Sequence, residues 1–382
     1  MDGNHNSSTL GTDRAESLKK QASSAVEISQ ITGAQLAGSN DPGAPDVHSK
    51  FGSRLLSAEQ DVFEHNAWDH VEPDDEYLQY AEQQIRMHHE HPVPTEKQEF
   101  YNNTPAAFWN SFYNNNQSKF FKDRHWLRIE FAELFEWTTD RKSASEGHTD
   151  ASTGKEDVHL ADSSDIAVSK SRGIAVASAL SSETSDAKFR IMEVGCGAGN
   201  AVFPLLADVS DPRLFVYACD YSKVAVDVVK SGEAYDENRC AALVWDLSST
   251  ELPPNVQSGS IDIMLMVFVF SALHPSQWSQ AVENAYRLLK PGGLLLFRDY
   301  GRNDLAQVRF KKSRLLEDNL YIRGDGTRVY FFTNDELADI FGTKFEIEQN
   351  AIDRRLIVNR KRELKMYRVW LQAKFRKPIN TD

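Results

Sequence analysis

A glycine-rich turn constrains the fold of this chain more than any other feature of its sequence. Residues 193–200 read E-V-G-C-G-A-G-N, and their glycines directly follow the predicted strand Phe189–Val194. Glycines at alternate positions let a backbone turn tightly and approach a ligand that a Cβ would exclude. The spacing G-x-G-x-G differs from the G-x-G-x-x-G turn that cradles a pyrophosphate, so it indicates a cofactor without phosphate. A purely structural turn remains the alternative for this motif alone.

The sequence around this turn alternates between strand and helix patterns. Such alternation predicts an α/β fold, in which helices cover both faces of a mostly parallel sheet. The fourth apolar run is nearly continuous, which is typical of a central strand buried on both faces. We predict strands at 189–194, 214–219, 241–245, 261–270 and 294–298, and helices from about Asn200, from about Lys223 and over 277–289.

Beyond residue 300 the pattern predicts smaller elements that complete the fold. A basic helix over 305–316 precedes a β-hairpin turning at Gly324–Gly326. Thr333 and Glu336 have capping-box spacing for the helix that follows. Two long strands, over 345–358 and 366–375, are expected to close the sheet as an antiparallel pair.

Two carboxylates follow successive predicted strands. Asp220, after the second strand, is placed to accept hydrogen bonds from ribose hydroxyls, and Asp246, after the third, from an adenine amino group. Either residue alone could equally be a helix cap. Together with the glycine turn, the pair resembles the class I S-adenosylmethionine-dependent methyltransferases, over residues 189–377. That resemblance implies a Rossmann-like, seven-stranded, mostly parallel sheet with an antiparallel last strand.

Sequence motifs that this chain lacks limit which kind of substrate atom can accept the methyl group. Methylation of an exocyclic base amine usually relies on an Asn- or Asp-Pro-Pro-aromatic loop after the fourth strand, where this chain has Ser271–Pro275. Methylation of pyrimidine carbon 5 needs a thiolate nucleophile. None of Cys196, Cys219 and Cys240 follows a proline or lies near the fourth strand. A substrate atom with its own lone pair therefore remains compatible.

Positive charge is concentrated near the C-terminus of an acidic chain. The formal net charge is −13, yet residues 302–377 hold 18 Lys and Arg against 11 Asp and Glu. Residues 354–377 hold ten basic residues and one acid, Glu363. Clustered cations beside aromatics fit the tracking of phosphates with stacking of bases. A solvated charged face is the competing interpretation.

Longer runs of sequence carry a more specific resemblance. Residues 106–113, 119–126, 297–301 and 325–332 mix aromatics and cations, and they closely resemble the tRNA N3-methylcytidine methyltransferases. The match runs from about residue 61 to 377, and Asp61–Val71 is similar to the branch that acts on threonine tRNAs. The resemblance implies methyl transfer from S-adenosylmethionine to N3 of cytidine 32 in the anticodon loop. Threonine tRNA is the expected substrate, with serine and arginine tRNAs as further candidates.

The resemblance also implies site residues. Asp299 is the expected catalytic carboxylate, stabilising the charge that develops on the base, with a salt bridge to Arg298 or Arg302 as its alternative role. Phe310, Tyr330 and Arg298 are expected to stack on the flipped base. The expected cofactor contacts, over which Trp109 and Tyr113 would close, are Trp109, Tyr113, Glu193, Gly195, Gly197, Gly199, Asp220, Asp246, Leu247 and Val267. The expected tRNA contacts are Lys119, Arg124, Arg298, Phe310, Arg314, Arg323, Arg328, Tyr330, Arg354 and Lys361.

Composition divides the chain into four parts. Residues 1–50 lack aromatic side chains and are expected to be a disordered tail, and 138–188 a disordered insertion. Between them, 51–137 is dense in aromatics and is expected to form a helical extension that closes the cofactor site and binds tRNA. The methyltransferase domain spans 189–377.

Several broader expectations accompany this interpretation. The anticodon stem-loop of tRNA is the expected partner, with a protein partner for tRNA recognition as a further candidate. No metal and no membrane are expected, and the missing signal sequence favours the cytoplasm, with the nucleus also compatible. The competing functions are a methyltransferase for a small molecule or protein, and a catalytically silent tRNA-binding subunit. A gel shift with total tRNA separates the first of these from the tRNA enzyme.

Overall fold

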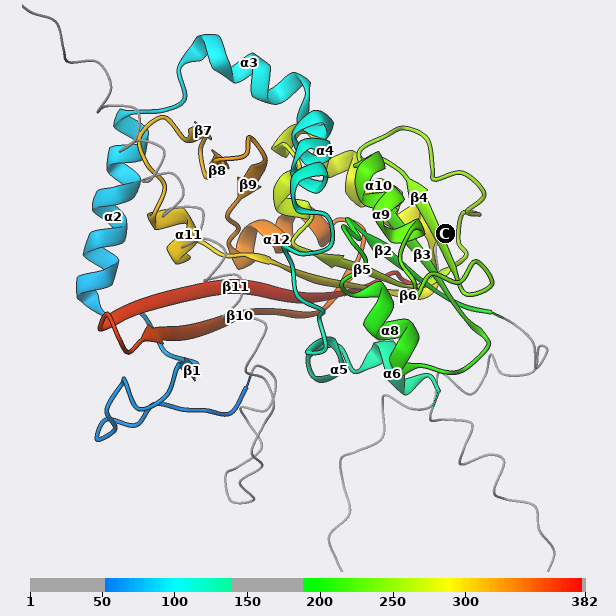
Figure 1. The fold of residues 1–382 in the computed structure, drawn as a ribbon, viewed down its shortest axis with the longest axis horizontal. Helices are drawn as coiled ribbons and strands as arrows, with labels where there is room; N and C mark the ends of the chain where they lie inside the picture. The colour runs from blue at the N-terminus through cyan, green and yellow to red at the C-terminus, as the bar shows by residue number, and fades with distance from the viewer. Residues whose placement is uncertain (1–51, 139–187, 380–382) are drawn as a thin grey trace, which may run out of the picture.

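The computed structural model describes residues 52–138 and 188–379. The predicted tail at 1–50, and the predicted insertion except for its two end residues, lie outside the described residues. At the centre of the molecule is an eight-stranded sheet with the strand order β4-β3-β2-β5-β6-β11-β10-β1 (Figure 1). The expected α/β architecture is confirmed.

Five parallel strands form one side of this sheet. They are β2 (Phe189–Val194), β3 (Leu214–Asp220), β4 (Cys240–Val244), β5 (Ile261–Val267) and β6 (Leu289–Tyr300). The last strand, β11 (Leu364–Arg376), is antiparallel to β6 on one side and to β10 (Glu346–Asn359) on the other. The prediction of a mostly parallel sheet with an antiparallel last strand is therefore confirmed.

The sheet has one strand more than predicted. Strand β1 (Ala67–Asp69) pairs with β10 and extends the edge of the sheet. Trp68, at its centre, is 1% exposed. Three residues are too few to show the alternating pattern of a strand, so the sequence alone could not reveal it.

Helices cover both faces of the sheet. They are α8 (Val202–Asp208), α9 (Lys223–Lys230), α10 (Trp278–Leu288) and α12 (Asn334–Phe341). Met264 and Met266 of β5 pack in the core that includes α10 and α12, whereas Ile263, Leu265 and Val267 pack in the core that includes α8 and α9. This alternation confirms β5 as a central strand buried on both faces. Within residues 52–138 and 188–379, none of the helices combines the length and apolarity that crossing a bilayer requires.

The region after the sheet's parallel strands differs from its prediction in one element. The prediction of a basic helix over 305–316 is wrong in length, because α11 covers only Leu305–Val308. The chain leaves the helix, takes a positive φ of 61° at Ser313, and enters strand β7 (Leu315–Glu317). Strand β7 joins β8 (Leu320–Ile322) and β9 (Arg328–Tyr330) in a small antiparallel sheet, so the predicted hairpin is confirmed with a third strand added.

The segment before the insertion wraps around the core. Its helices are α2 (Asp75–Glu90), α3 (Thr95–Asn103), α4 (Pro105–Asn116), α5 (Leu127–Glu130) and α6 (Glu133–Glu136). Helix α2 lies beside α11 and the small sheet, whereas α5 and α6 lie near α8 (Figure 1). The aromatic side chains of this segment therefore pack against several distant parts of the fold.

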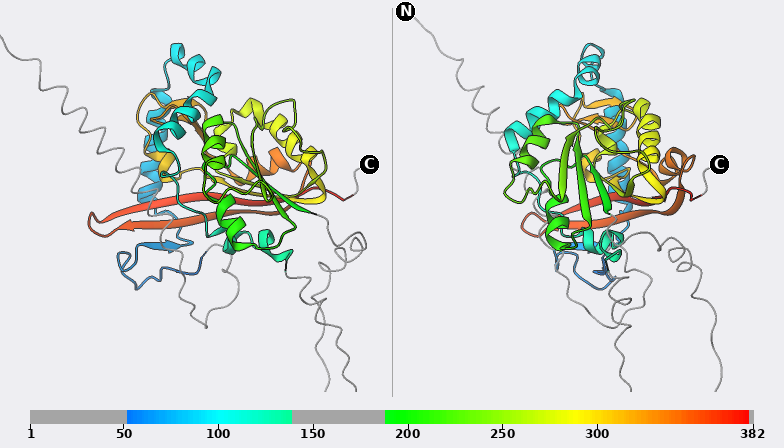
Figure 2. Two further views of the ribbon diagram at one scale, coloured as in Figure 1. Left: turned by 45° about the vertical axis from the view of Figure 1, so that its right-hand side comes forward. Right: turned by 90° about the vertical axis from the view of Figure 1, so that its right-hand side faces the viewer.

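The hairpin of β10 and β11 connects these regions. Only Trp370–Arg376 of β11 pair with β6, so the other half of the hairpin projects past the parallel strands (Figure 2). Tyr77 and Ala81 of α2 pack there against Tyr367, in a cluster that also includes Trp68. The N-terminal segment and the projecting half of the C-terminal hairpin therefore share one hydrophobic cluster.

Candidate active site

A large cavity lies where the parallel strands end. Its volume is about 910 Å³, within the size range of small-molecule sites. Its walls come from the carboxyl ends of the strands, from the N-terminal segment and from the small sheet. Ligands of open α/β sheets bind at this edge, so the cavity is the candidate active site.

The glycine turn forms one wall of the cavity. Gly195 and Gly197 line it and have φ values of 68° and 54°. A Cβ on Gly195 would lie 2.5 Å from Cγ2 of Val269, and a Cβ on Gly197 would lie 2.5 Å from the hydroxyl of Tyr113. Both positions therefore require glycine for conformation and for space.

Asp220 stands beside this turn. Its carboxylate accepts the backbone N–H of Gly197 at 2.9 Å and that of Ser222 at 2.8 Å. Burial raises the pKa of Asp220 to about 6, although these two N–H donors act in the opposite direction. The residue lines the cavity, where its remaining lone pairs can accept hydroxyl groups of a ligand.

This pKa predicts how cofactor binding depends on pH. The carboxylate form of Asp220 accepts hydrogen bonds from hydroxyls, whereas the protonated form loses acceptor capacity. We expect the affinity for S-adenosylmethionine to be constant above pH 7 and to fall by up to tenfold per unit once the pH drops below about 6. Isothermal titration calorimetry between pH 5 and 8 measures this. A flat profile, or one shared by Asp220→Asn, would contradict the assignment.

Further predicted cofactor residues line the same wall. Asp246, Leu247 and Val267 all face the cavity. Asp246 accepts the backbone N–H and the hydroxyl of Ser248 at 2.8 and 2.7 Å, which fixes its carboxylate. The strand-end acids are thus brought together with the glycine turn, as the sequence predicts.

Helix α4 covers this wall. Trp109 and Tyr113 line the cavity from α4, with their rings stacked at a centroid distance of 6.2 Å. Asn110 accepts the hydroxyl of Ser222 at 2.7 Å, and so ties α4 to the start of α9. The two aromatics therefore lie where the resemblance places them, over the glycine turn.

Two predicted cofactor contacts do not reach the cavity. Glu193 is 2% exposed and lies behind the turn, where it accepts a hydrogen bond from Arg124 at 3.2 Å. Burial raises the pKa of Glu193 to about 8, while Arg124 lowers it. Gly199 is also outside the lining, and a Cβ there would meet the ring of Phe203 at 2.5 Å. Both residues shape the turn rather than face a ligand.

The residues present fit S-adenosylmethionine. The turn leaves space for backbone approach, and two carboxylates face the cavity to accept hydroxyl and amine protons. Arg124 lines the cavity, but its guanidinium is paired with Glu193 instead of being free to hold a phosphate. This donor set suits a nucleoside cofactor without phosphate.

The opposite wall contains a buried ionic network. Arg298 of β6 is 5% exposed, donates to Gln372 at 2.6 Å and pairs with Asp353. Arg355 pairs with Asp353 and with Glu130, each at 3.2 Å. The network joins the N-terminal segment to β6, β10 and β11 along this wall.

Arg298 is also enclosed by aromatic rings. Its guanidinium carbon lies 5.2 Å from the ring of Trp126 and 5.0 Å from that of Trp370. The prediction that Arg298 stacks on the base needs correction, because its guanidinium already lies over two tryptophan rings and is paired with Asp353. It lines the cavity as part of the network.

Two aromatics that the sequence analysis missed line the cavity. Phe268 directly follows β5 and Tyr300 ends β6, with their rings 4.8 Å apart. Phe268 has a φ of 58°, a strained conformation for a bulky residue and one that clusters at functional sites. This φ also ends β5 three residues before the predicted end. The apolar run around Phe268 concealed it, because a core residue there shows the same pattern.

Asp299 does not line the cavity, which corrects its predicted catalytic role. It is wholly buried, and its carboxylate accepts the backbone N–H of Ser271 and of Tyr300, each at 2.9 Å. Its alternative role is also wrong, because Arg298 pairs with Asp353 and Arg302 with Glu336. Asp299 fixes the turn η2 (Phe270–Ala272) against β6.

The structure separates the predicted tRNA contacts into two groups. Arg124, Arg298, Phe310, Arg314, Arg323 and Arg328 line the cavity. Lys119, Tyr330, Arg354 and Lys361 do not. Tyr330 is 6% exposed and packs against Trp278, so its predicted stacking role is wrong.

The C-terminal cations are largely paired with acids. Arg354 pairs with Glu72, Lys365 with Asp74, Lys374 with Glu133, Arg376 with Glu348 and Arg368 with Asp304. Three of these five acids come from the N-terminal segment. For these residues the basic cluster is structural. The sequence could not show the pairs with the N-terminal segment, because those partners lie about 240 to 300 positions away.

Comparison with known proteins identifies the family. The methyltransferase domain model matches residues 192–295. The tRNA N(3)-methylcytidine methyltransferase of Schizosaccharomyces pombe is 48% identical over 87% of this chain and 93% of its own length. The tRNA N(3)-cytidine methyltransferase of Danio rerio is 46% identical over 86% of this chain and 90% of its own.

A third relative has a more specific name. The tRNA(Thr) (cytosine(32)-N(3))-methyltransferase of Saccharomyces cerevisiae is 44% identical over 87% of this chain, which corresponds to 46% of that longer protein. In all three relatives the similarity extends well beyond the methyltransferase domain model. The chain therefore belongs to the family of tRNA N3-cytidine methyltransferases.

Proposed function

We propose that this chain methylates N3 of cytidine in tRNA, with cytidine 32 of threonine tRNA as its target. The names of the relatives support the reaction, and the Saccharomyces cerevisiae relative supports the position and the tRNA. The observation that carries the proposal is the cavity itself. It combines a nucleoside-type wall, formed by the glycine turn with Asp220 and Asp246, with a wall of aromatics and arginines.

The chemistry requires little beyond positioning. S-adenosylmethionine supplies an electrophilic methyl group. Unprotonated N3 of cytidine already has an in-plane lone pair, so no general base is needed. Holding the two reactants in line contributes most of the rate enhancement.

The protein's own residues account for the positioning. A base in an anticodon loop must be splayed out before its N3 is accessible, and the lost stacking has to be replaced. Phe268 and Tyr300 lie between the two walls and present ring surface for this purpose. Arg323, whose guanidinium carbon is 5.5 Å from the ring of Tyr300, adds positive charge for the adjoining phosphate.

Nucleoside analysis tests the reaction. The full chain is incubated with methyl-labelled S-adenosylmethionine and total tRNA, and the digested tRNA is analysed by mass spectrometry. We expect labelled 3-methylcytidine, and none with Asp220→Asn. Label in a different nucleoside alone, or only in proteins or small molecules, would overturn the proposal.

The ion pairs of the C-terminal region also bear on how the tRNA is selected. We infer that a second protein contributes to choosing the tRNA, because the charged C-terminal surface that sequence analysis assigned to RNA is largely neutralised by internal pairs. Comparing the rate on threonine tRNA with and without cell extract tests this inference. An extract that leaves the rate unchanged argues that the chain selects its tRNA alone.

A further inference from the structure

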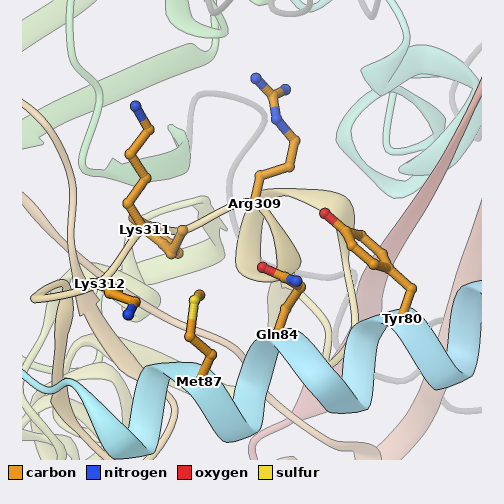
Figure 3. A pocket seen from close by; sticks show the side chains of 7 residues that line it. Tyr80, Gln84, Met87, Arg309, Lys311 and Lys312 are labelled. Carbon is orange, nitrogen blue, oxygen red and sulfur yellow. The ribbon is translucent and has the colours of Figure 1, made fainter.

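A second hollow adjoins the active-site cavity. Its volume is about 470 Å³, and it lies between α2 and residues 309–312. Figure 3 shows Tyr80, Gln84 and Met87 pointing in a row from α2 towards this segment. Arg309 and Phe310 line both hollows, so the two lie side by side. We call this second hollow the α2 groove.

The α2 groove carries unneutralised positive charge. Arg309, Lys311 and Lys312 are exposed, and none of them pairs with an acid among residues 52–138 and 188–379. Arg309 and Lys311 extend away from α2 (Figure 3). These side chains differ from the cations of β10 and β11, most of which are held in ion pairs. Three free cations beside one hollow favour an anionic ligand.

The groove is held rigid from both sides. The ring of His88, on α2, is wholly buried and contacts the carbonyl of Phe310 at 2.7 Å. The backbone N–H of Ser313 donates to the carbonyl of His91 at 2.7 Å. The ring of Phe310 stacks on that of Tyr321 at a centroid distance of 4.7 Å. A site built this way needs little ordering when a ligand binds.

We propose that the α2 groove binds the phosphodiester backbone of the anticodon-loop nucleotides next to the methylated cytidine. This inference rests on the proposed function, because the cavity that would receive the target base shares Arg309 and Phe310 with the groove. Lys311 and Lys312 neutralise phosphates, Arg309 bridges the groove and the cavity, and the ring of Tyr80 offers a stacking surface. Cations interleaved with aromatic rings suit single-stranded nucleic acid.

A charge-matched pair of variants tests the site. Lys311→Gln with Lys312→Gln removes two charges from the groove. The control, Lys188→Gln with Lys230→Gln, also removes two exposed charges. Lys188 directly precedes β2 and Lys230 ends α9, and neither residue lines the groove or the cavity. Binding of full-length threonine tRNA is measured by fluorescence anisotropy at several salt concentrations.

The groove variant is expected to lose affinity in a specific way. We expect its Kd for tRNA to rise about tenfold and the slope of log Kd against log salt to fall by about 1.4, or about 0.7 per lost contact with a single strand. Calorimetry should show unchanged affinity for S-adenosylmethionine. The control pair should remain within about twofold of the unmodified protein. Equal losses in both pairs would mean that the groove charges act only through net charge, and would overturn the proposal.

Modified RNA identifies the ligand group. Threonine tRNA is assembled by ligation with a single neutral methylphosphonate in place of one loop phosphodiester at a time. A linkage next to cytidine 32 should weaken binding to the unmodified protein but should have no further effect in the groove variant. The proposal fails if no loop linkage matters, or if the same linkage matters equally in both proteins.

Failure of the groove proposal can be distinguished from failure of the proposed reaction. Absence of 3-methylcytidine, with the linkage effect intact, refutes the proposed reaction but leaves the groove as an RNA site. Formation of 3-methylcytidine, with no linkage effect, refutes the groove alone.

Discussion

Asp220→Ala is expected to weaken the binding of S-adenosylmethionine by about a hundredfold or more. Hydrogen bonds to a charged group contribute about 1.5–3 kcal/mol each, and we expect the carboxylate to accept two ribose hydroxyls. It also anchors the backbone of Gly197, so its loss releases the turn that shapes the site. Calorimetry at pH 7.5 measures the change in affinity.

A neighbouring acid provides the control. Asp227→Ala removes an exposed carboxylate from α9, where it pairs with Lys223. We expect its affinity for S-adenosylmethionine to match that of the unmodified protein. Unchanged affinity in Asp220→Ala, at an unchanged melting temperature, would remove Asp220 from the site.

Asp353→Ala is expected to lower the free energy of unfolding by about 3–5 kcal/mol. Asp353 is wholly buried between Arg298 and Arg355, so its removal leaves two cations in the interior with much less compensation. Burial alone would raise the pKa of Asp353, but these arginines hold it below its usual value. Thermal unfolding should show a melting temperature lower by roughly 5–10 °C.

A partly exposed pair that includes another acid of β10, Glu348, provides the comparison. Glu348→Ala breaks the pair with Arg376, and it should cost less than about 1 kcal/mol because the pair is partly solvated. Similar small losses in both variants would show that the network around Asp353 contributes no more than a surface pair. The buried network of Arg298, Asp353 and Arg355 would then not be what stabilises this wall of the cavity.

The sequence revealed the cofactor half of the site because that half is local. Gly195, Gly197 and Asp220 lie at the ends of strands that their own apolar runs predict. Parallel strands bring their carboxyl ends to one edge, so adjacency in the fold follows from order in the chain. The same logic recovered most of the sheet, including the antiparallel hairpin.

The acceptor half depends on distant contacts and was less predictable. Asp299 and Tyr330 have residue types suited to the predicted roles, but packing against Ser271 and Trp278 withdraws them from the cavity. Phe268 reaches the cavity through a single positive φ that no pattern reports. The helix expected over 305–316 stopped early because Ser313 takes a positive φ and Leu315 and Leu316 belong to strand β7, a tertiary effect that overrides local propensity.

The central claim is methylation of one atom at one position. The most direct measurement supplies the full chain with methyl-labelled S-adenosylmethionine and two transcripts of threonine tRNA, one unaltered and one with cytidine 32 replaced by uridine. We expect 3-methylcytidine in the first transcript and no label in the second. Equal labelling of both transcripts, or label in any nucleoside other than 3-methylcytidine, would contradict it.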